Sequence, residues 1–213
     1  MPTLVLTKND LKGAGILSTI EIPGSGSNII VDEMGDLLIK TGQTTSYRTG
    51  DDGDLEAGRE VDFFTLGENN PFGNTNRFTD ELGGSTYTNG IIIDWTTYDS
   101  SEVLGYYPDT TTTRTWNDTI DWAIALSVGT FTSGWRLGNI REYINIQNYG
   151  SGFAMQYAPF NTTVQWWTSN TLTISTTAAW QISGVGEAKQ LGKTFTLNGI
   201  AVRNFTVTGT TLT

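Results

Sequence analysis

The stretch SGWRLGNIREYINI (Ser133–Ile146) gives the clearest structural signal in this chain of 213 residues. Asn139 has a side chain that can accept hydrogen bonds from the first N–H groups of a helix, and Glu142 follows at the third helical position. Apolar and amide residues then recur at helical spacing, and the expected packed face consists of Ile140, Tyr143, Ile144 and Gln147. The stretch therefore predicts a helix that begins at Asn139.

A second helix is predicted upstream, in TWNDTIDWAIALS (Thr115–Ser127). Thr115 and Asp118 stand three residues apart, as in a capping box, so the helix is expected to begin near Thr115. Its apolar residues recur at helical intervals and predict one packed stripe, made of Trp116, Ile120, Ala123, Ile124 and Ser127.

Most of the remaining chain is typical of strands and loops. GIIIDWTTY (Gly90–Tyr98) is the clearest strand, and its apolar start predicts burial on both faces, whereas TTTTRT (Thr110–Thr115) is interpreted as a connection. Four further strands are expected, at Thr163–Ser169, Thr171–Thr176, Ala178–Ser183 and Lys193–Thr208. The class is therefore α+β, with two helices on a twisted, mainly antiparallel sheet. Trp116, Trp135 and Trp180 are expected in one core.

Two units are predicted along the chain. Residues 1–40 contain short strands, with a loop PGSGSN (Pro23–Asn28) and a hairpin turning near Met34-Gly35. They are interpreted as an N-terminal β module for attachment or oligomerisation; the alternative is an extra hairpin on the same domain. Residues 41–213 form the main domain.

Composition excludes several classes of function. The chain contains neither Cys nor His, which removes disulfides, thiolate nucleophiles, Cys-ligated metals and the usual general base. A formal net charge of −10 argues against a nucleic-acid surface. After Asp121 the only carboxylate side chains are Glu142 and Glu187, so this region is polar through Thr, Ser, Asn and Gln. Neither a secretory signal nor an apolar run long enough to span a bilayer is found.

Further motifs follow the two predicted helices in a fixed order: APFN (Ala158–Asn161), QWWTS (Gln165–Ser169), AWQIS (Ala179–Ser183) and AVR (Ala201–Arg203). From Thr41 to Arg203, and most specifically from Thr115, the series resembles the Lcl C-terminal-domain-like family. The members of this family adopt a C-type-lectin-like fold and are frequent in bacterial surface adhesins and environmental bacteriophages.

The chain departs from the family pattern at three points. Relatives carry a W-R-L-P-N-x-x-E-L-like segment that links a strand to the second helix; this chain has Gly138 in place of Pro and Tyr143 in place of Leu. Relatives often carry cysteines, and this chain has none. Gly138 is expected to loosen the turn that leads into the helix. Without cysteines the fold must be held by packing alone.

The resemblance implies a structural virion protein, displayed on a phage capsid or tail, whose lectin-like domain attaches to host-surface or environmental glycans. It would be made in the host cytoplasm, would assemble with other virion proteins, and would form a homo-oligomer. No cofactor, nucleic acid or membrane insertion is expected. The alternatives are a bacterial surface adhesin of the same fold and a glycan depolymerase.

The sequence gives only weak support for catalytic or metal-binding residues. Asp94 and Asp99 flank Trp95 and Tyr98, an arrangement that a glycan hydrolase could use, but no motif sets their separation. Asp51, Asp52, Asp54, Glu56 and Glu60 cluster in one loop without the spacing of an EF-hand, so no metal site is expected. The protein is not expected to be an enzyme.

Trp166 and Trp167 are adjacent in a predicted strand, so their side chains should point to opposite faces. Alternation with Val164 favours burying Trp166, whereas the resemblance favours burying Trp167. Following the resemblance leaves Trp166 as the exposed ring. An exposed ring can stack on a sugar while neighbouring amides bind its hydroxyls. The predicted ligand-binding residues are therefore Trp166, Tyr149, Tyr157, Gln165 and Asn170. The alternative is that Trp166 packs under a loop or against a neighbouring subunit.

Overall fold

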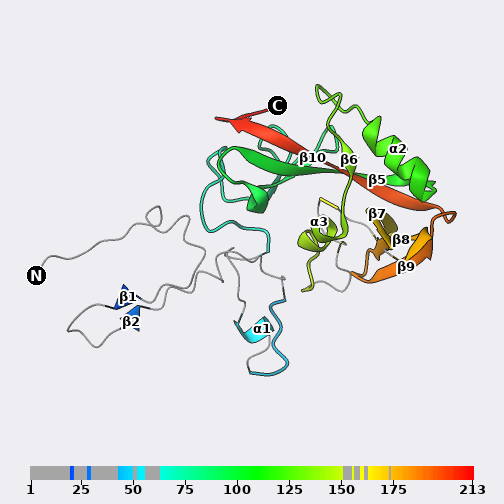
Figure 1. Ribbon diagram of the computed structural model, residues 1–213. Helices are drawn as coiled ribbons and strands as arrows, with labels where there is room; N and C mark the ends of the chain where they lie inside the picture. The colour runs from blue at the N-terminus through cyan, green and yellow to red at the C-terminus, as the bar shows by residue number, and fades with distance from the viewer. Residues whose placement is uncertain are drawn as a thin grey trace, which may run out of the picture.

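The computed structural model describes residues 20–21, 28–29, 43–49, 52–55, 63–150, 155, 159–160, 163–172 and 174–213. It is an α+β structure dominated by one mixed sheet, as the sequence predicts (Figure 1). The elements of the main unit are β3 (Phe78–Thr79), β4 (Ile92–Asp94), the 3-10 turn η1 (Trp95–Thr97), β5 (Glu102–Arg114), α2 (Trp116–Ile124), β6 (Arg136–Leu137), α3 (Ile140–Asn145), β7 (Gln165–Leu172), β8 (Ser175–Ser183), β9 (Ala188–Gly192), β10 (Leu197–Thr208) and β11 (Thr211–Leu212).

Near the N-terminus, β1 (Ile20–Glu21) pairs antiparallel with β2 (Asn28–Ile29), and α1 (Asp52–Leu55) is a single turn. The two paired strands flank the predicted PGSGSN loop. The hairpin predicted near Met34-Gly35 lies outside the described residues.

The long strand β10 organises the nine-stranded sheet, whose main path runs β3-β4-β5-β10-β7-β8-β9. It pairs antiparallel with β5 along most of its length, and β6 and β11 also pair antiparallel with it. The one parallel pair along this path joins β10 to β7. The sheet is therefore mainly antiparallel, as expected.

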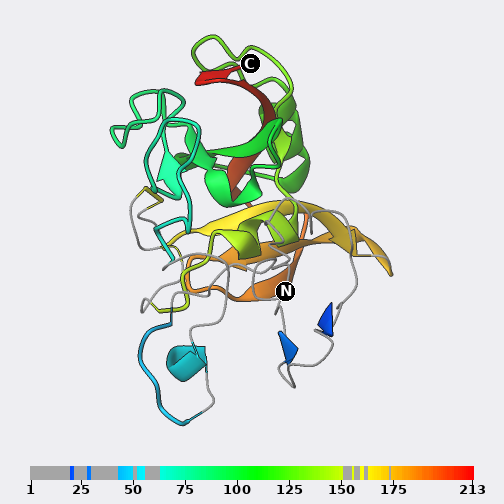
Figure 2. The ribbon, with the colours of Figure 1, turned by 90° about the vertical axis from the view of Figure 1, so that its left-hand side faces the viewer.

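Side chains of β10 alternate between two separate cores. Ala201 and Phe205 belong to a first core, together with Ala123 of α2, whereas Ile200 and Val202 belong to a second core. The second core also contains residues of α3. Successive strand residues point to opposite faces, so the two helices cover opposite sides of the sheet. Figures 1 and 2 show α2 on one side of the β5–β10 pair and α3 on the other.

Helix α2 begins as predicted, but its buried face differs from the expected stripe. The Thr115 hydroxyl oxygen accepts a hydrogen bond from the Asp118 N–H, which caps the helix. Thr119 and Ala123 are fully buried, whereas Ile124 is 62% exposed and Ser127 is exposed. The prediction was wrong at these last two positions because the buried face is centred on Thr119 and Ala123, and Ser127 lies beyond the end of the helix at Ile124.

Helix α3 begins at Asn139 as predicted. The Asn139 side chain accepts hydrogen bonds from the N–H groups of Arg141 and Glu142, and the Glu142 carboxylate accepts one from the Asn139 N–H, so the capping box is complete. Tyr143 and Gln147 are buried, but Ile144 is 44% exposed. Ile146, beyond the helix, takes the expected place of Ile144 in the second core.

Several strand predictions need correction. Thr171–Thr176 was expected as a strand of its own, but β7 continues through Leu172 and β8 begins at Ser175. The threonines at 110–113 were expected in a connection, but they lie within β5. The ladder skips them, because Arg114 pairs with Leu197 and Asp109 pairs with Gly199. Strand β9 was not predicted.

The predicted tryptophan core forms only in part. Trp135 is buried in the first core, and Trp116 packs against it. Trp180 is half-buried and belongs to neither core, so its expected place was wrong.

Candidate functional site

The predicted exposed ring of Trp166 is in fact fully buried, with 0% of its surface accessible. The alternation rule holds, since Trp166 lies in the second core and Trp167 lies in the first. The prediction of exposure failed because both faces of the sheet are covered at this point of β7. Trp166 therefore cannot stack on a sugar in this structure.

The other predicted binding residues do not form one exposed surface. Asn170 is held inward, where its side-chain oxygen accepts a hydrogen bond of 2.8 Å from the N–H of Ile140 at the start of α3. Gln165 is exposed at the opposite end of β7. Tyr149 is 48% exposed, and its hydroxyl donates to the buried Gln147. Tyr157 lies outside the described residues.

The segment that resembles the lectin-like family builds the framework around α3. Trp135 donates its indole N–H to the Phe131 carbonyl across 3.1 Å and fills the first core. Arg136 makes two hydrogen bonds to the Glu142 carboxylate, one of them 2.9 Å long. The same carboxylate caps α3, so strand β6 and helix α3 are joined by one charged side chain.

Gly138 and Tyr143, the two departures from the family pattern, occupy one space. A Cβ atom at position 138 would lie 2.2 Å from Cε1 of Tyr143, so the ring fills the volume that a side chain at 138 would need. The Tyr143 hydroxyl donates to the Ile200 carbonyl across 2.6 Å and accepts from the Ile200 N–H across 3.3 Å. The Gly138 N–H also donates to that carbonyl. Gly138 therefore makes room for a tyrosine that completes the hydrogen bonding of β10.

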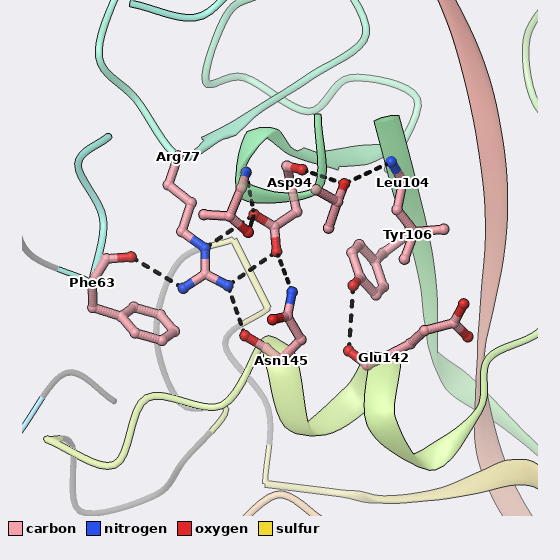
Figure 3. Close-up of polar contacts among 9 residues, drawn as sticks. Phe63, Arg77, Asp94, Leu104, Tyr106, Glu142 and Asn145 are labelled. Carbon is pink, nitrogen blue, oxygen red and sulfur yellow. Dashed lines mark hydrogen bonds and ion pairs between the residues drawn. The ribbon is translucent and has the colours of Figure 1, made fainter. Parts of the chain in front are cut away.

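Asp94, considered above as a catalytic carboxylate, lies in a buried ion pair (Figure 3). Arg77 binds both of its oxygens, with Nε–Oδ1 and Nη2–Oδ2 distances of 3.0 Å, and neither side chain is exposed. Thr96 donates its N–H and hydroxyl to Oδ1, and Asn145 donates its amide to Oδ2. Each carboxylate oxygen thus has protein donors, as a buried charge requires.

The same arginine joins three segments that are distant in sequence. It donates to the carbonyls of Phe63 and Asn145, and its guanidinium lies 4.3 and 4.6 Å from the ring centres of Phe63 and Phe78. Because Asn145 ends α3, the ion pair fixes the C-terminal end of this helix against β3 and η1. Its geometry is that of a structural anchor.

Asp99 does not face Asp94. Its Oδ1 atom accepts hydrogen bonds from the N–H groups of Ser101 and Glu102 in an exposed turn. Hydrogen bonds from Glu102 and then Ser101 hold the pKa of Asp99 below its usual range. The carboxylate pair proposed for glycan hydrolysis therefore has one member buried in an ion pair and the other capping a turn.

In the part of the chain that the structure describes, no three His, Cys, Asp or Glu side chains are grouped to hold a metal ion. Of the acidic loop considered above, much lies outside the described residues. No helix among the described residues is long and apolar enough to cross a membrane.

A half-buried aromatic ring, that of Trp180, lies on β8 beside β9. Trp180 stands directly opposite Gln190 of β9, which is exposed. On the β7 side, Trp167 pairs with Gln181 and Thr171 pairs with Ala179. Between these two pairs, three residues of β7 lie opposite the single residue Trp180. This bulge leaves the indole without a directly paired neighbour on β7. Sequence reasoning missed the site because it exchanged the roles of Trp166 and Trp180.

No model of a known protein family matches this chain, and none of the curated proteins matches it.

Proposed function

We propose that the protein is a structural bacteriophage virion protein, displayed on the capsid or tail, whose C-type-lectin-like domain attaches to host-surface or environmental glycans. The observation that carries the proposal is the strand-to-helix segment from Trp135 to Glu142. Its residues resemble the family motif, and they support the fold at this point, since Trp135 fills a core while Asn139 and Glu142 cap α3. This use of the motif residues supports the lectin-like assignment.

Two further features favour display on a particle. The chain has no cysteine, and buried packing with the Arg77–Asp94 pair holds the described domain. Such a domain needs no oxidising compartment to fold, which suits assembly in the host cytoplasm. Trp180 and Gln190 provide a half-buried ring beside a side-chain amide, the combination that suits sugars. Many copies on one particle would strengthen weak single sites.

The proposal is tested with an antibody raised against the full chain. Purified virions should be labelled at regular positions, and particles should attach to host cells or isolated envelope glycans. Labelling of uninfected bacterial cells in place of virions would support the adhesin alternative. Shortening of a polysaccharide by the pure protein would support the depolymerase alternative.

A further inference from the structure

Resting on the proposed attachment function, we infer that the open face of β8 and β9 binds an uncharged glycan by stacking it on Trp180 and Phe195. The site lies away from the predicted Trp166 surface. Trp180 was expected in a core, and Phe195 was not among the predicted binding residues.

Trp180 and Phe195 lie on the same face of the sheet. In the β8–β9 ladder Trp180 pairs with Gln190, and Ala178 pairs with Gly192. Paired residues share a face, and so do residues two apart on one strand. Phe195 extends this face, because a Cβ atom at Gly192 would lie 3.5 Å from its ring. The Phe195 ring is 58% exposed.

The two rings are spaced for one ligand. Gly192, under the Phe195 ring, is the diagonal neighbour of Trp180, and such positions are about 7 Å apart, within reach of aromatic side chains. Between them the surface is formed by small residues, Ala178 and Gly192. The result is a shallow ledge with an aromatic ring at each end and the Gln190 amide beside one of them.

Helix α3 leaves this face open. It begins at β7, where Asn170 accepts from the Ile140 N–H, and it ends at β4, where Asn145 donates to Asp94. In the sheet order β4 lies on one side of β10, and β8 and β9 lie beyond β7 on the other. The C-terminal end of the helix therefore lies beyond β10 from β9, although the helix also lies close to β8. Ile182, one row further along β8, is buried in the second core, whereas Trp180 is half-buried and belongs to neither core of the described residues.

The chemistry of the face selects an uncharged ligand. The β8 residues on this face are Thr176, Ala178, Trp180 and Ile182, and their partners in β9 are Ala188, Gln190 and Gly192. None of these side chains carries a charge. Lys189 pairs with Gln181 on the opposite face and is bound to Glu187. A sugar without charged groups can stack its apolar face on the rings and donate and accept hydrogen bonds at the amide. An acidic sugar would find no cation among these residues.

The backbone that carries the two rings is also held by hydrogen bonds before binding. The Thr168 hydroxyl, from the β7 bulge, donates to the Trp180 carbonyl across 2.9 Å. The Phe195 N–H donates to the Gly192 carbonyl across 3.1 Å and closes the β9–β10 turn. A bound glycan would therefore immobilise little of the protein, which lowers the entropic cost of binding.

The test uses the full chain and four variants. Trp180→Phe keeps a ring, Trp180→Leu removes it, and Phe195→Ala removes the second ring. Ile124→Ala, an exposed apolar residue on the helix that covers the opposite face, is the matched control. Binding is measured to immobilised dextran and galactomannan as neutral polymers, to alginate as an acidic one, and to host envelope polysaccharide. Each titration is run at low and at high salt, and the unfolding midpoint of each variant is recorded.

We expect binding to a neutral polymer or to the host polysaccharide that is independent of salt. Trp180→Leu and Phe195→Ala should each weaken it by about tenfold. Trp180→Phe should lose only a few-fold, and Ile124→Ala should bind like the original chain. Because Phe195 is exposed, its variant remains informative even if a Trp180 variant unfolds.

Four outcomes would overturn the inference. Undiminished binding by Trp180→Leu and Phe195→Ala would place the ligand elsewhere and leave the proposed attachment function standing. Binding only to alginate, lost at high salt, would overturn the ligand class. If the ring variants bind glycan normally but no longer join particles, the face is an assembly interface. Failure of the original chain to bind any of these polymers or host cells would overturn the proposed function, and the inference with it.

Discussion

Gly138 and Tyr143 should be energetically coupled, because the ring of one occupies the side-chain space of the other. Gly138→Ala places a Cβ atom 2.2 Å from Cε1 of Tyr143 and 3.0 Å from Cδ1 and Cζ, so the ring must move. Overpacking of a core typically costs about 1–3 kcal/mol. A displaced ring also weakens the bonds of its hydroxyl to Ile200, worth about 1 kcal/mol. We expect Gly138→Ala to lower the free energy of unfolding by about 2–4 kcal/mol.

The double variant separates this clash from a conformational role of glycine. Tyr143→Leu removes the ring and leaves the Ile200 N–H without its partner, at a cost of about 2–4 kcal/mol. Once the ring is gone, alanine at 138 fits. The costs of Gly138→Ala and Tyr143→Leu should therefore fall short of additivity by about 1–3 kcal/mol. Proline at 138 is a poorer test, because it would also remove the hydrogen bond from the Gly138 N–H to Ile200.

Denaturant unfolding followed by tryptophan fluorescence gives the four free energies of this cycle. Tyr143→Phe isolates the hydroxyl and should cost about 1–3 kcal/mol. Strictly additive single costs would refute the reasoning, since they would mean that the ring and the new Cβ atom do not compete for space.

Other predictions follow from the same contacts. Asn139→Ala removes the α3 cap and should lower the free energy of unfolding by about 1 kcal/mol; an unchanged midpoint would mean that the cap contributes nothing. Asp94→Asn leaves Arg77 as an unbalanced buried cation and should cost about 3–5 kcal/mol in the same assay, with a cost below about 1 kcal/mol as the contrary result. Burial raises the pKa of Asp80, but hydrogen bonds from Gly84, Leu82 and Thr86 outweigh it and hold the pKa below its usual value. Its stabilisation is therefore present above the unfolded pKa of about 3.9 and is lost as pH falls through the lower folded value, so Asp80→Asn should flatten the acid side of a stability–pH curve. A chelator should leave the melting temperature unchanged, and a clear drop would reveal a bound metal.

Helix starts could be predicted because they depend on neighbours in the sequence. Thr115 and Asn139 cap helices through bonds that span three residues, and both caps form as expected. The depth to which each helix face is buried depends on which distant elements lie against it. Ile124 and Ile144 follow the helical spacing of a packed face, yet both are exposed. No local pattern contains that information.

Gly138 shows a second limit of sequence reasoning. Glycine was expected to loosen the turn, an interpretation based on its backbone freedom. Its φ does not lie in the left-handed region, and the structure shows that it is the missing side chain that matters. The sequence places Gly138 and Tyr143 near one another in a helix entry, but only the fold shows that one residue accommodates the other.

Trp166 was expected to be exposed and Trp180 to be buried, but Trp166 is buried and Trp180 is half-buried. The position of the short helix α3 helps to explain the difference. Alternation predicted correctly that Trp166 and Trp167 point to opposite faces, but exposure depends on what covers each face. Helix α3 is anchored at β7 by Asn170 and runs toward β4, so the second core it closes includes Trp166 and leaves out Trp180. The cover over Trp166 thus depends on contacts such as the α3 anchor, which joins residues 30 positions apart.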